Sequence, residues 1–444
     1  MAQKFLSCDR DQVMLLPPDM AEWLPEGHLA RFVIEVVDQL DLSAIYGWYR
    51  VDGHGRPAHD PAMMTALLLF NYSVGVCSSR AIERRCVEDV ACRVLAANRR
   101  PDHATIARFR VRHQAELSEL FFQVLELCKD AGMVRVGTVA VDSTKLAANA
   151  SLGANRTHQQ LRLEAERLLG QAAETDARED DQFGECRGDE LPEDLADPGT
   201  RAARIGELLE RARKRVEKIE AERTEMLNRR AEHETETGKR PRGRRPGEGP
   251  DKQQRRVLER EKYNLTDPDS KIVSHRGMLI QGYNVQTAVS AGQIILAIRA
   301  GDGAADPGQL APTVADAIAN LRRVGIDERI KDLLADRGYW HTQQILDLQK
   351  DKIRVLVPPS NGRARSPERM SPEAQKMNQT LASEDGKAAY LQRQQIVEPV
   401  FAQTKHHRGI TRILRRGREA VQAELDLIAT THNLLKLYRN PQTA

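Results

Sequence analysis

The sequence predicts a mixed α/β protein with a helical N-terminal region and a helical insertion after its first strand. Three observations lead to this fold class. Apolar residues follow helical spacing up to about residue 132, short β-rich runs begin at residue 136, and heptads fill residues 205–226. The 444 residues exceed what one ordinary core takes up, so two or three domains are expected.

The composition is typical of a cytosolic protein with much exposed surface. Hydrophobic residues make up 40%, charged residues 30% and aromatic residues 4%, which argues against a protein that grips single strands on aromatic platforms. The 67 basic and 64 acidic residues nearly cancel, so only clustered charge is informative about nucleic acid. The N-terminus lacks an apolar signal core, and residues 63–77 are too few to span a bilayer. We therefore expect no membrane partner.

The six cysteines are scattered and include no Cys-x-x-Cys pair. Reduced, buried thiols are expected rather than a zinc site or a disulfide framework. The cysteines are Cys8, Cys77, Cys86, Cys92, Cys128 and Cys186.

Residues 1–132 are predicted to form a helical DNA-binding domain. Pro61 can open one helix and Ser79 can cap the next. The helical pattern breaks at 101–105, and the helix predicted after this break contains Arg108 and Arg110. Short helices of which one begins with basic residues are compatible with a helix-turn-helix motif that binds DNA. A small helical domain with a solvated basic face explains the same segment equally well.

Residues 157–263 are predicted to be an insertion. Apolar residues on a 3-4 alternation indicate a helical hairpin or a short coiled coil. The acidic stretch 174–197 is predicted to be a loop, and the basic stretch 239–245 is either a DNA-gripping arm or a solvated loop. The heptad residues are Ile205, Leu209, Ala212, Val216, Ile219 and Met226.

The remaining segments, 133–156 and 264–444, are predicted to form one α/β domain. Its first strand is 136–141, and 282–289 with 294–299 form a hairpin that turns at 290–292. The segments that follow alternate between helix and strand. They are a helix at 309–324, a strand at 330–335, a helix at 341–350, a strand at 353–357 and a helical region from about 388.

Two aspartates follow apolar strands directly. Asp142 ends the first strand and Asp336 ends the strand at 330–335. An aspartate in such a place is often only a turn former or a helix cap. Two of them on strands that can be neighbours, with Glu398 on a late helix, favour a site for two Mg²⁺ or Mn²⁺ ions instead. In this arrangement Asp142 bridges the ions, and Asp336 and Glu398 each complete one coordination shell. Glu384 and Glu419 are not expected to be the third metal-binding carboxylate.

Several motifs, in this order along the chain, resemble those of bacterial insertion-sequence transposases. Near the C-terminus, Tyr390, Arg393, Glu398 and Lys405 resemble the family's Tyr-Arg-Glu-Lys signature, and residues 395–401 and 431–436 look like the same group. The resemblance extends over nearly the whole chain apart from the insertion. The earlier motifs are Gly53-x-Gly55-Arg56-Pro57, Pro101-Asp102-His103, Asp142-Ser143-Thr144-Lys145, Gly282-Tyr283-Asn284, Gln309-Leu310-x-Pro312 and Asp336-Arg337-Gly338-Tyr339.

The signature departs from the family in one respect. Four residues separate Arg393 from Glu398, where the family has three. On an ideal helix Tyr390, Gln394, Glu398 and Lys405 share a face, from which Arg393 is turned away. Either the helix contains a one-residue bulge or Gln394 takes the place of the arginine.

A basic run follows Glu398. Lys405, Arg408, Arg412 and Arg415 lie where the DNA backbone would pass a metal-bound Glu398, so phosphate neutralisation is a better reading than a solvated face. Lys405 is expected to contact phosphate near the scissile bond. Tyr390, Arg393, Arg108 and Arg110 complete the expected DNA contacts.

The resemblance implies a ribonuclease H-like catalytic domain and a DDE triad of Asp142, Asp336 and Glu398. The implied activity is metal-dependent cleavage and strand transfer of double-stranded DNA at the ends of an insertion sequence. The implied partners are terminal repeats, target DNA and a second copy of the chain, in the bacterial cytoplasm at the nucleoid. Two alternatives stay open: an inactive DNA-binding protein derived from a transposase, and a ribonuclease H-like nuclease that does not join ends.

Overall fold

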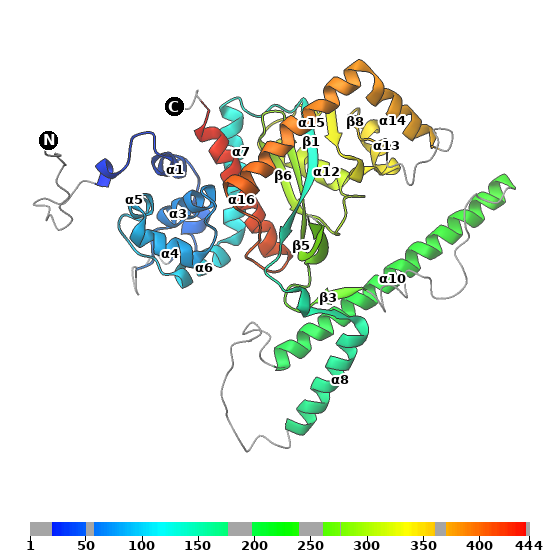
Figure 1. Ribbon diagram of the computed structural model, residues 1–444, viewed down its shortest axis with the longest axis horizontal. Coiled ribbons are helices and arrows are strands. Elements are labelled where there is room, and N and C mark those ends of the chain that lie inside the picture. Colours follow the sequence, from blue (N-terminus) through cyan, green and yellow to red (C-terminus); the bar gives the residue numbers. More distant parts are fainter. Residues whose placement is uncertain are drawn as a thin grey trace, which may run out of the picture. The chain divides into compact units, whose positions relative to one another are not determined.

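The protein is described by a computed structural model that covers residues 20–49, 57–175, 198–238, 261–275, 277–359 and 370–440 (Figure 1). The chain forms two compact units. The first unit comprises Met1–Thr144, Val285–Leu414 and Glu419–Ala444. The second unit comprises Lys145–Asn284 and Arg415–Arg418.

The first unit begins with short helices. Aspartate side chains cap three of them, because a carboxylate can accept a bond from a backbone N–H that the first turn leaves unpaired. Asp60 accepts from Met63 N, and Asp102 from Thr105 N. The elements are η1 (Met20–Trp23), α1 (Leu29–Val37), α2 (Ser43–Tyr46), α3 (Pro61–Ser73), α4 (Ser79–Glu88), α5 (Val90–Leu95), α6 (His103–Arg112) and α7 (Gln114–Asp130).

A mixed sheet follows, in the order β4-β5-β1-β7-β8, with β6 paired to β5. β1 pairs in parallel with β7, and β7 with β8, whereas β5 pairs antiparallel with β6 and β4. Leu333, Leu334, Val355 and Leu356 are buried, as expected for parallel strands that are covered on both faces. The strands are β1 (Thr138–Ala147), β4 (Lys271–His275), β5 (Met278–Ser290), β6 (Ile295–Ala300), β7 (Asp332–Ala335) and β8 (Arg354–Leu356).

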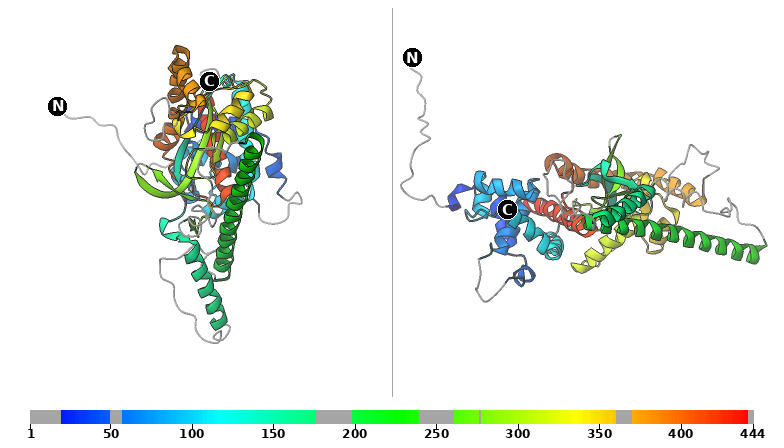
Figure 2. Two further views of the ribbon diagram at one scale, coloured as in Figure 1. Left: turned by 90° about the vertical axis from the view of Figure 1, so that its right-hand side faces the viewer. Right: turned by 90° about the horizontal axis from the view of Figure 1, so that it is seen from below.

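Helices cover the sheet of the first unit. α12 (Leu310–Arg323) packs against β6, α13 (Thr342–Lys350) against β8 and α15 (Glu384–Ala402) against β7. Figure 2 shows α15 on one side of the sheet and α12 with α13 on the other. α14 (Pro372–Ala382) packs on α15, which continues into a π-helical turn at Gln403–His407. α16 (Arg418–Tyr438) is the last helix.

Two amides of α16 close the free edge of β6. Gln422 and Asn433 are eleven residues apart, about three helical turns, and therefore share a face. Asn433 accepts from Ile295 N at 2.9 Å and donates to Ile295 O at 3.0 Å. Gln422 donates to Ile298 O at 2.8 Å and accepts from Ala300 N at 3.3 Å. These side chains supply the partners that a neighbouring strand would otherwise provide.

A close backbone contact joins the N-terminal helices to the C-terminal part of the same unit. Gly75, after α3, has φ of +84°, and a Cβ at this position would lie 1.7 Å from the carbonyl oxygen of Arg408. The Arg408 guanidinium donates to Tyr72 O at 2.9 Å and to Thr431 Oγ1 at 2.5 Å. Only glycine combines this backbone conformation with so close an approach.

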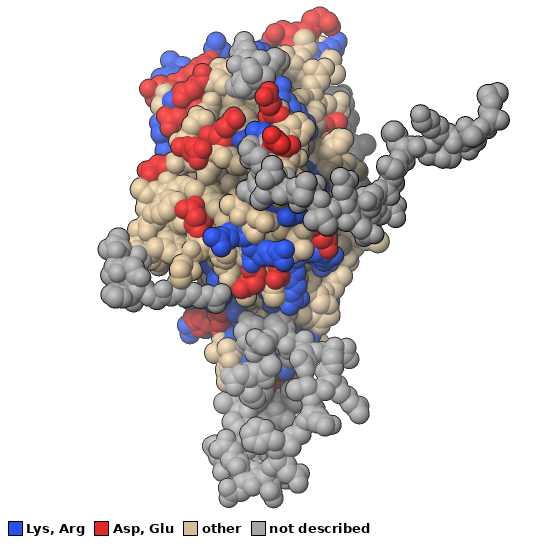
Figure 3. Space-filling model, turned by 90° about the vertical axis from the view of Figure 1, so that its left-hand side faces the viewer, with Lys and Arg blue, Asp and Glu red and all other residues tan. Residues whose placement is uncertain are grey.

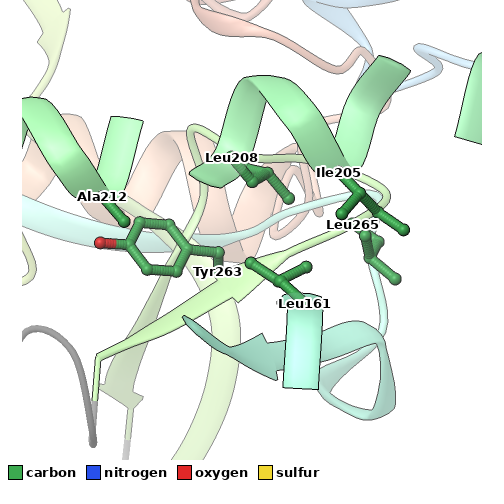
Figure 4. Packing of buried hydrophobic residues seen from close by; sticks show 6 residues of the cluster. All are labelled: Leu161, Ile205, Leu208, Ala212, Tyr263 and Leu265. Carbon is green, nitrogen blue, oxygen red and sulfur yellow. The ribbon is translucent and has the colours of Figure 1, made fainter. Parts of the chain in front are cut away.

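The second unit is built on a helical hairpin. α8 (His158–Thr175) and α10 (Pro198–Thr237) pack against each other and against the short ribbon of β2 (Asn155–Thr157) and β3 (Lys262–Asn264), which follows η2 (Leu152–Ala154). Met226, the last of the predicted heptad residues, is 52% exposed, so the apolar stripe of α10 is not buried to its end. The core shown in Figure 4 consists of Leu161, Ile205, Leu208, Ala212, Tyr263 and Leu265.

The predicted α/β class, with a helical N-terminal region and a mixed sheet, is confirmed. β1 is longer than expected and continues past Asp142, because Asp142–Ala147 remain in the sheet. α14 occupies a charged segment for which no element was expected, and Ser371 caps it by accepting from Ala374 N. Ser79 does not cap α4; Ser78 holds the cap position, and the Ser79 hydroxyl accepts from Arg110.

The compact units and the predicted domains divide the chain differently, and the domain boundaries stay a prediction. Residues 1–132 share the first unit with 285–414, and the predicted insertion 157–263 lies within the second unit. Several predictions fall outside the described residues: most of the acidic loop, the basic stretch 239–245, the Gly53-x-Gly55-Arg56 part of its motif, Cys8 and Cys186. The four described cysteines are buried free thiols, as expected.

Candidate active site

Asp142 and Asp336 lie at neighbouring positions of two adjacent parallel strands. The last register pair between β1 and β7 is Val141 with Ala335, and each aspartate is the next residue in its chain. Burial raises the pKa of Asp142 to about 6, and the charge of Asp336 contributes to the increase. The structure therefore brings together the two carboxylates that the sequence placed at strand ends.

Asp142 is held by two donors. Its Oδ1 accepts from Ser143 N at 2.7 Å, and its Oδ2 forms an ion pair with Arg393 Nη1 at 2.7 Å. The side chains of Asp142 and Arg393 are 18% and 13% exposed. Tyr390, one turn earlier on α15, also bonds to Arg393. Water screens the attraction within this pair only weakly, but desolvation outweighs it, because the pKa of Asp142 stays raised beside Arg393.

The position of Arg393 corrects an expectation from the helix geometry. Either a one-residue bulge or Gln394 in place of the arginine was expected, but Arg393 itself meets Asp142 and Gln394 is exposed. No bulge separates Arg393 from Glu398, since the π-helical turn begins only at Gln403. The face of α15 that packs inward includes Ile396, Val397 and Val400, and burial of this face determines its rotation.

Glu398 is exposed on α15. Five residues on an α-helix correspond to about 500°, so Glu398 projects roughly 140° away from the direction of Arg393. Among the described residues, no group of three or more His, Cys, Asp and Glu side chains is placed to hold a metal ion. Asp142 and Asp336 offer the hard oxygen ligands that Mg²⁺ prefers, whereas Glu398 is not joined to them in this arrangement.

Asp336 starts a tight turn, and a series of hydrogen-bonded polar side chains lies next to it. Its side chain caps η3 (Arg337–Tyr339) and accepts from Gly338 N at 2.8 Å. The hydroxyl of the buried Tyr339 donates to Gln286 Oε1, and Gln286 Nε2 donates to Asp306 Oδ1 at 3.1 Å. Burial, with the nearby charges of Asp306, Asp142 and Asp336, raises the pKa of Tyr339 far above its usual value. Tyr339 is therefore a neutral hydrogen-bond donor.

Asp306 is a third carboxylate at this place that sequence reasoning missed. A Cβ on Gly338 would lie 3.0 Å from Asp336 Oδ1 and 3.2 Å from Asp306 Oδ2, so both carboxylates border the same glycine. Asp306 precedes α12 in an irregular segment, where no periodic pattern signals it. The only available signal was its closeness in sequence to the Gln309-Leu310-x-Pro312 motif.

Two arginines expected at DNA are buried inside the first unit. Arg110 donates to Tyr72 Oη at 2.9 Å, to Cys77 O at 2.8 Å and to Ser79 Oγ at 2.5 Å, and it is 9% exposed. Arg408 is 5% exposed, and burial lowers its pKa to about 10. A guanidinium whose donors are used inside the protein cannot neutralise a phosphate, so the predicted DNA contacts of Arg110 and Arg408 are corrected to structural roles.

The other predicted DNA contacts lie nearer the surface. Arg108 and Arg412 are exposed, and Lys405 is half-buried with interactions of its own. Arg415 belongs to the second unit. On the face drawn in Figure 3, a group of basic side chains has acidic side chains directly beside it, in keeping with the small net charge of +3. A broad electrostatic field of one sign is not evident on that face.

Comparison with protein families places transposase domains at two parts of the chain. Residues 18–112 match a transposase domain (DUF772), and residues 360–438 match a transposase DDE domain. The first match covers α1 to α6, and the second covers α14 to α16 with Arg393, Glu398 and Lys405. No curated protein and no solved structure is significantly similar to the chain. Two separate segments of the chain are thus similar to transposase domains, and the second is similar to a transposase DDE domain.

Proposed function

We propose that this protein cleaves and joins double-stranded DNA at the ends of an insertion sequence, with Asp142, Asp336 and Glu398 as its three essential carboxylates. The main support is the register of β1 and β7, which pairs the residues directly before Asp142 and Asp336. The strand order β6-β5-β1-β7-β8, with the antiparallel pair on one side and parallel strands on the other, is compatible with a ribonuclease H-like fold.

The ligand chemistry of Asp142 and Asp336 suits Mg²⁺ or Mn²⁺, and two such ions would stabilise the attacking and the leaving oxygen of a phosphodiester. Glu398 lies on the helix that carries Arg393, and we propose that it completes the site when DNA is bound. In the described arrangement Arg393 supplies the positive charge that Asp142 needs. The Tyr339 hydroxyl donates to Gln286 next to the turn in which Asp336 accepts from Gly338 N.

Lys405 and Arg412 are proposed to contact DNA phosphates beyond Glu398, since lysine and arginine neutralise the backbone without reading sequence. Joining two ends requires that they be held together, so we propose that at least two copies of the chain act in the complex with the terminal repeats and the target. The described residues include no helix long and apolar enough to cross a membrane.

The test is cleavage and joining of DNA that carries the element's ends, in Mg²⁺ or Mn²⁺. The wild type is compared with Asp142→Asn, Asp336→Asn and Glu398→Gln, and Glu384→Gln serves as a control on the same helix, because Glu384 is 93% exposed. Each triad variant should bind DNA as the wild type does but lose both reactions, whereas Glu384→Gln keeps them. Binding without metal-dependent chemistry by the wild type would identify an inactive DNA-binding protein instead. Cleavage without joining would identify a nuclease.

A further inference from the structure

A cavity of about 500 Å³ opens among the N-terminal helices of the first unit. None of its lining residues belongs to the candidate active site. Met64 of α3, Phe109 and two arginines of α6, and Tyr49 and His59 from the segments before α3 form its walls. Its volume falls in the range of sites that hold small molecules or single nucleotides, roughly 300–1,000 Å³.

The floor is apolar and one wall is aromatic. Met64 and Phe109 are buried, at 1% and 5% exposure. Tyr49 is half-buried; its hydroxyl lies 3.1 Å from His113 Nε2, and its ring centroid lies 5.5 Å from that of His113. The charge of Arg112 acts on the Tyr49 hydroxyl and opposes the rise of its pKa on burial. Tyr49 is therefore held in place before any ligand arrives, which lowers the entropy cost of stacking a ring against it.

Arginines border the same cavity. Arg108 and Arg112 are four residues apart on α6 and share one face, and Arg100 lies before that helix. All three are exposed. The Arg108 guanidinium donates two long hydrogen bonds, at 3.3 Å to Ala104 O and 3.4 Å to Thr105 Oγ1. Asp102 also lines the cavity, and its carboxylate accepts from Thr105 N, so three guanidinium groups stand against one carboxylate. A planar guanidinium suits bidentate contact with phosphate, and this excess of positive charge favours an anion.

The parts of the cavity match those of a nucleotide. The apolar floor and the aromatic wall suit a base, and the arginines at the mouth suit its phosphates. A phosphate alone would leave the floor and Tyr49 unused. An intact duplex would present its backbone and its base edges, but no base face to stack on Tyr49. A nucleotide out of the stack can place its base in the cavity while its phosphates stay at the arginines. A single aromatic side chain is enough to stack one base. A chain with only 4% aromatic residues can therefore form such a site.

We propose that this cavity binds one unpaired nucleotide of DNA, with the base against Tyr49 and the adjoining phosphates at Arg108 and Arg112. This inference rests on the proposed function, because it assumes that DNA is the substrate. It assigns to the N-terminal helices the recognition of a nucleotide that has left the double helix, in addition to contacts with duplex phosphates.

The experiment uses the full-length protein and two DNAs of the same sequence that carry the element's end. One is fully paired, and the other has a single unpaired 5-iodouracil, placed in turn at each position of the end. Affinity is measured across a salt series, and photochemical cross-links are mapped by mass spectrometry. The variants are Tyr49→Leu, Tyr49→Phe and Arg108→Ala, with Arg84→Ala as the control, since Arg84 is exposed on α4 and does not line the cavity.

At one or more positions, the wild type should bind the unpaired DNA about 5- to 150-fold more tightly than the paired DNA, the range expected for stacking one base. The cross-link should fall on Tyr49 or His59. Tyr49→Leu should lose the preference but still bind duplex, and Tyr49→Phe should largely keep it. Arg108→Ala should weaken binding and lower the salt slope by about one phosphate contact. Arg84→Ala should leave the preference unchanged.

Equal affinity of the wild type for both DNAs at every position would overturn this proposal and leave the proposed function standing. So would a preference that survives in Tyr49→Leu, or a cross-link that maps elsewhere. Failure to bind any DNA would overturn the proposed function as well.

Discussion

At the scale of single residues, burial rather than residue type separates structural from functional arginines. Arg108 and Arg110 belong to the same helix and are both basic residues of a segment expected to contact DNA. Their positions differ by 200° around the helix, so one faces solvent and the other faces the core. Arg110 uses its donors on Tyr72, Cys77 and Ser79, which join α3, α4 and α6.

These two arginines form a matched pair for mutation. Arg110→Ala should destabilise the protein by on the order of 2–4 kcal/mol, because three buried acceptors lose their donor. Arg108→Ala should change stability by less than about 0.5 kcal/mol and weaken DNA binding. Denaturant unfolding and DNA-binding assays on both variants measure this. A stable Arg110→Ala protein with impaired DNA binding would contradict the structural role.

A buried carboxyl in α16 predicts a pH dependence of stability. Burial raises the pKa of Asp426 to about 6, although Gln422 and Ser118 donate to it. Because the folded-state pKa lies above the ordinary value of 3.8, folding favours the protonated form. The contribution of this group to stability is thus greatest below pH 4 and is lost as pH rises through about 6.

Asp426→Asn should remove this dependence, since an amide keeps an acceptor oxygen and carries no charge. The variant should gain on the order of 1–3 kcal/mol relative to wild type between pH 4 and pH 7.5. Unfolding free energies at the two pH values, from denaturant titrations, give the comparison. A difference between variant and wild type that does not change with pH would show that Asp426 titrates normally.

At the scale of elements, buried faces determine how helices are rotated and where they end. The inward face of α15 turns Arg393 toward Asp142 and leaves Glu398 exposed. α16 lies along β6, where Gln422 and Asn433 replace the missing strand. The turn after α3 approaches the backbone of Arg408 so closely that a side chain at Gly75 has no space.

Two glycines with positive φ allow the cost of backbone strain to be measured apart from the cost of steric crowding. Gly75 has φ of +84° and backbone atoms of Arg408 against it, whereas Gly132 has φ of +67° and nothing within 4 Å of its ideal Cβ. Gly132→Ala should cost about 1 kcal/mol, the usual penalty for a left-handed residue. Gly75→Ala should cost several times more, because backbone must move as well. Thermal melting of both variants tests this, and equal losses would indicate that the turn relaxes freely.

At the scale of the whole molecule, the chain forms two compact units, each with its own buried cluster. The second unit buries Leu161, Leu208 and Tyr263. The strands β1 and β5 contain residues of both units. Because the second unit has a buried cluster of its own, we expect each unit to have a stability that can be changed separately.

Leu208→Ala should destabilise the second unit by about 2–5 kcal/mol, the usual cost of a cavity at a fully buried leucine. Hydrogen exchange measured by mass spectrometry should show lost protection in α8 and α10 and unchanged protection in β7 and β8. Leu333→Ala, at an equally buried site in β7, should give the reverse pattern. Loss of protection throughout the chain in either variant would mean that the two units unfold as one.

The sequence by itself determined most helices and strands of the α/β part, the helical hairpin and the two aspartates beside apolar runs. These features follow from local periodicity: an apolar run rich in Val, Ala and Leu directly before Asp142 or Asp336 is visible in a few residues. It did not determine which arginines are buried, which side of α15 faces Asp142, or that Asp306 joins Asp336 at Gly338. Those outcomes depend on contacts between segments distant in sequence. Only the tertiary structure decides which face of each helix is removed from water, and this face determines whether a charged side chain meets a partner or solvent.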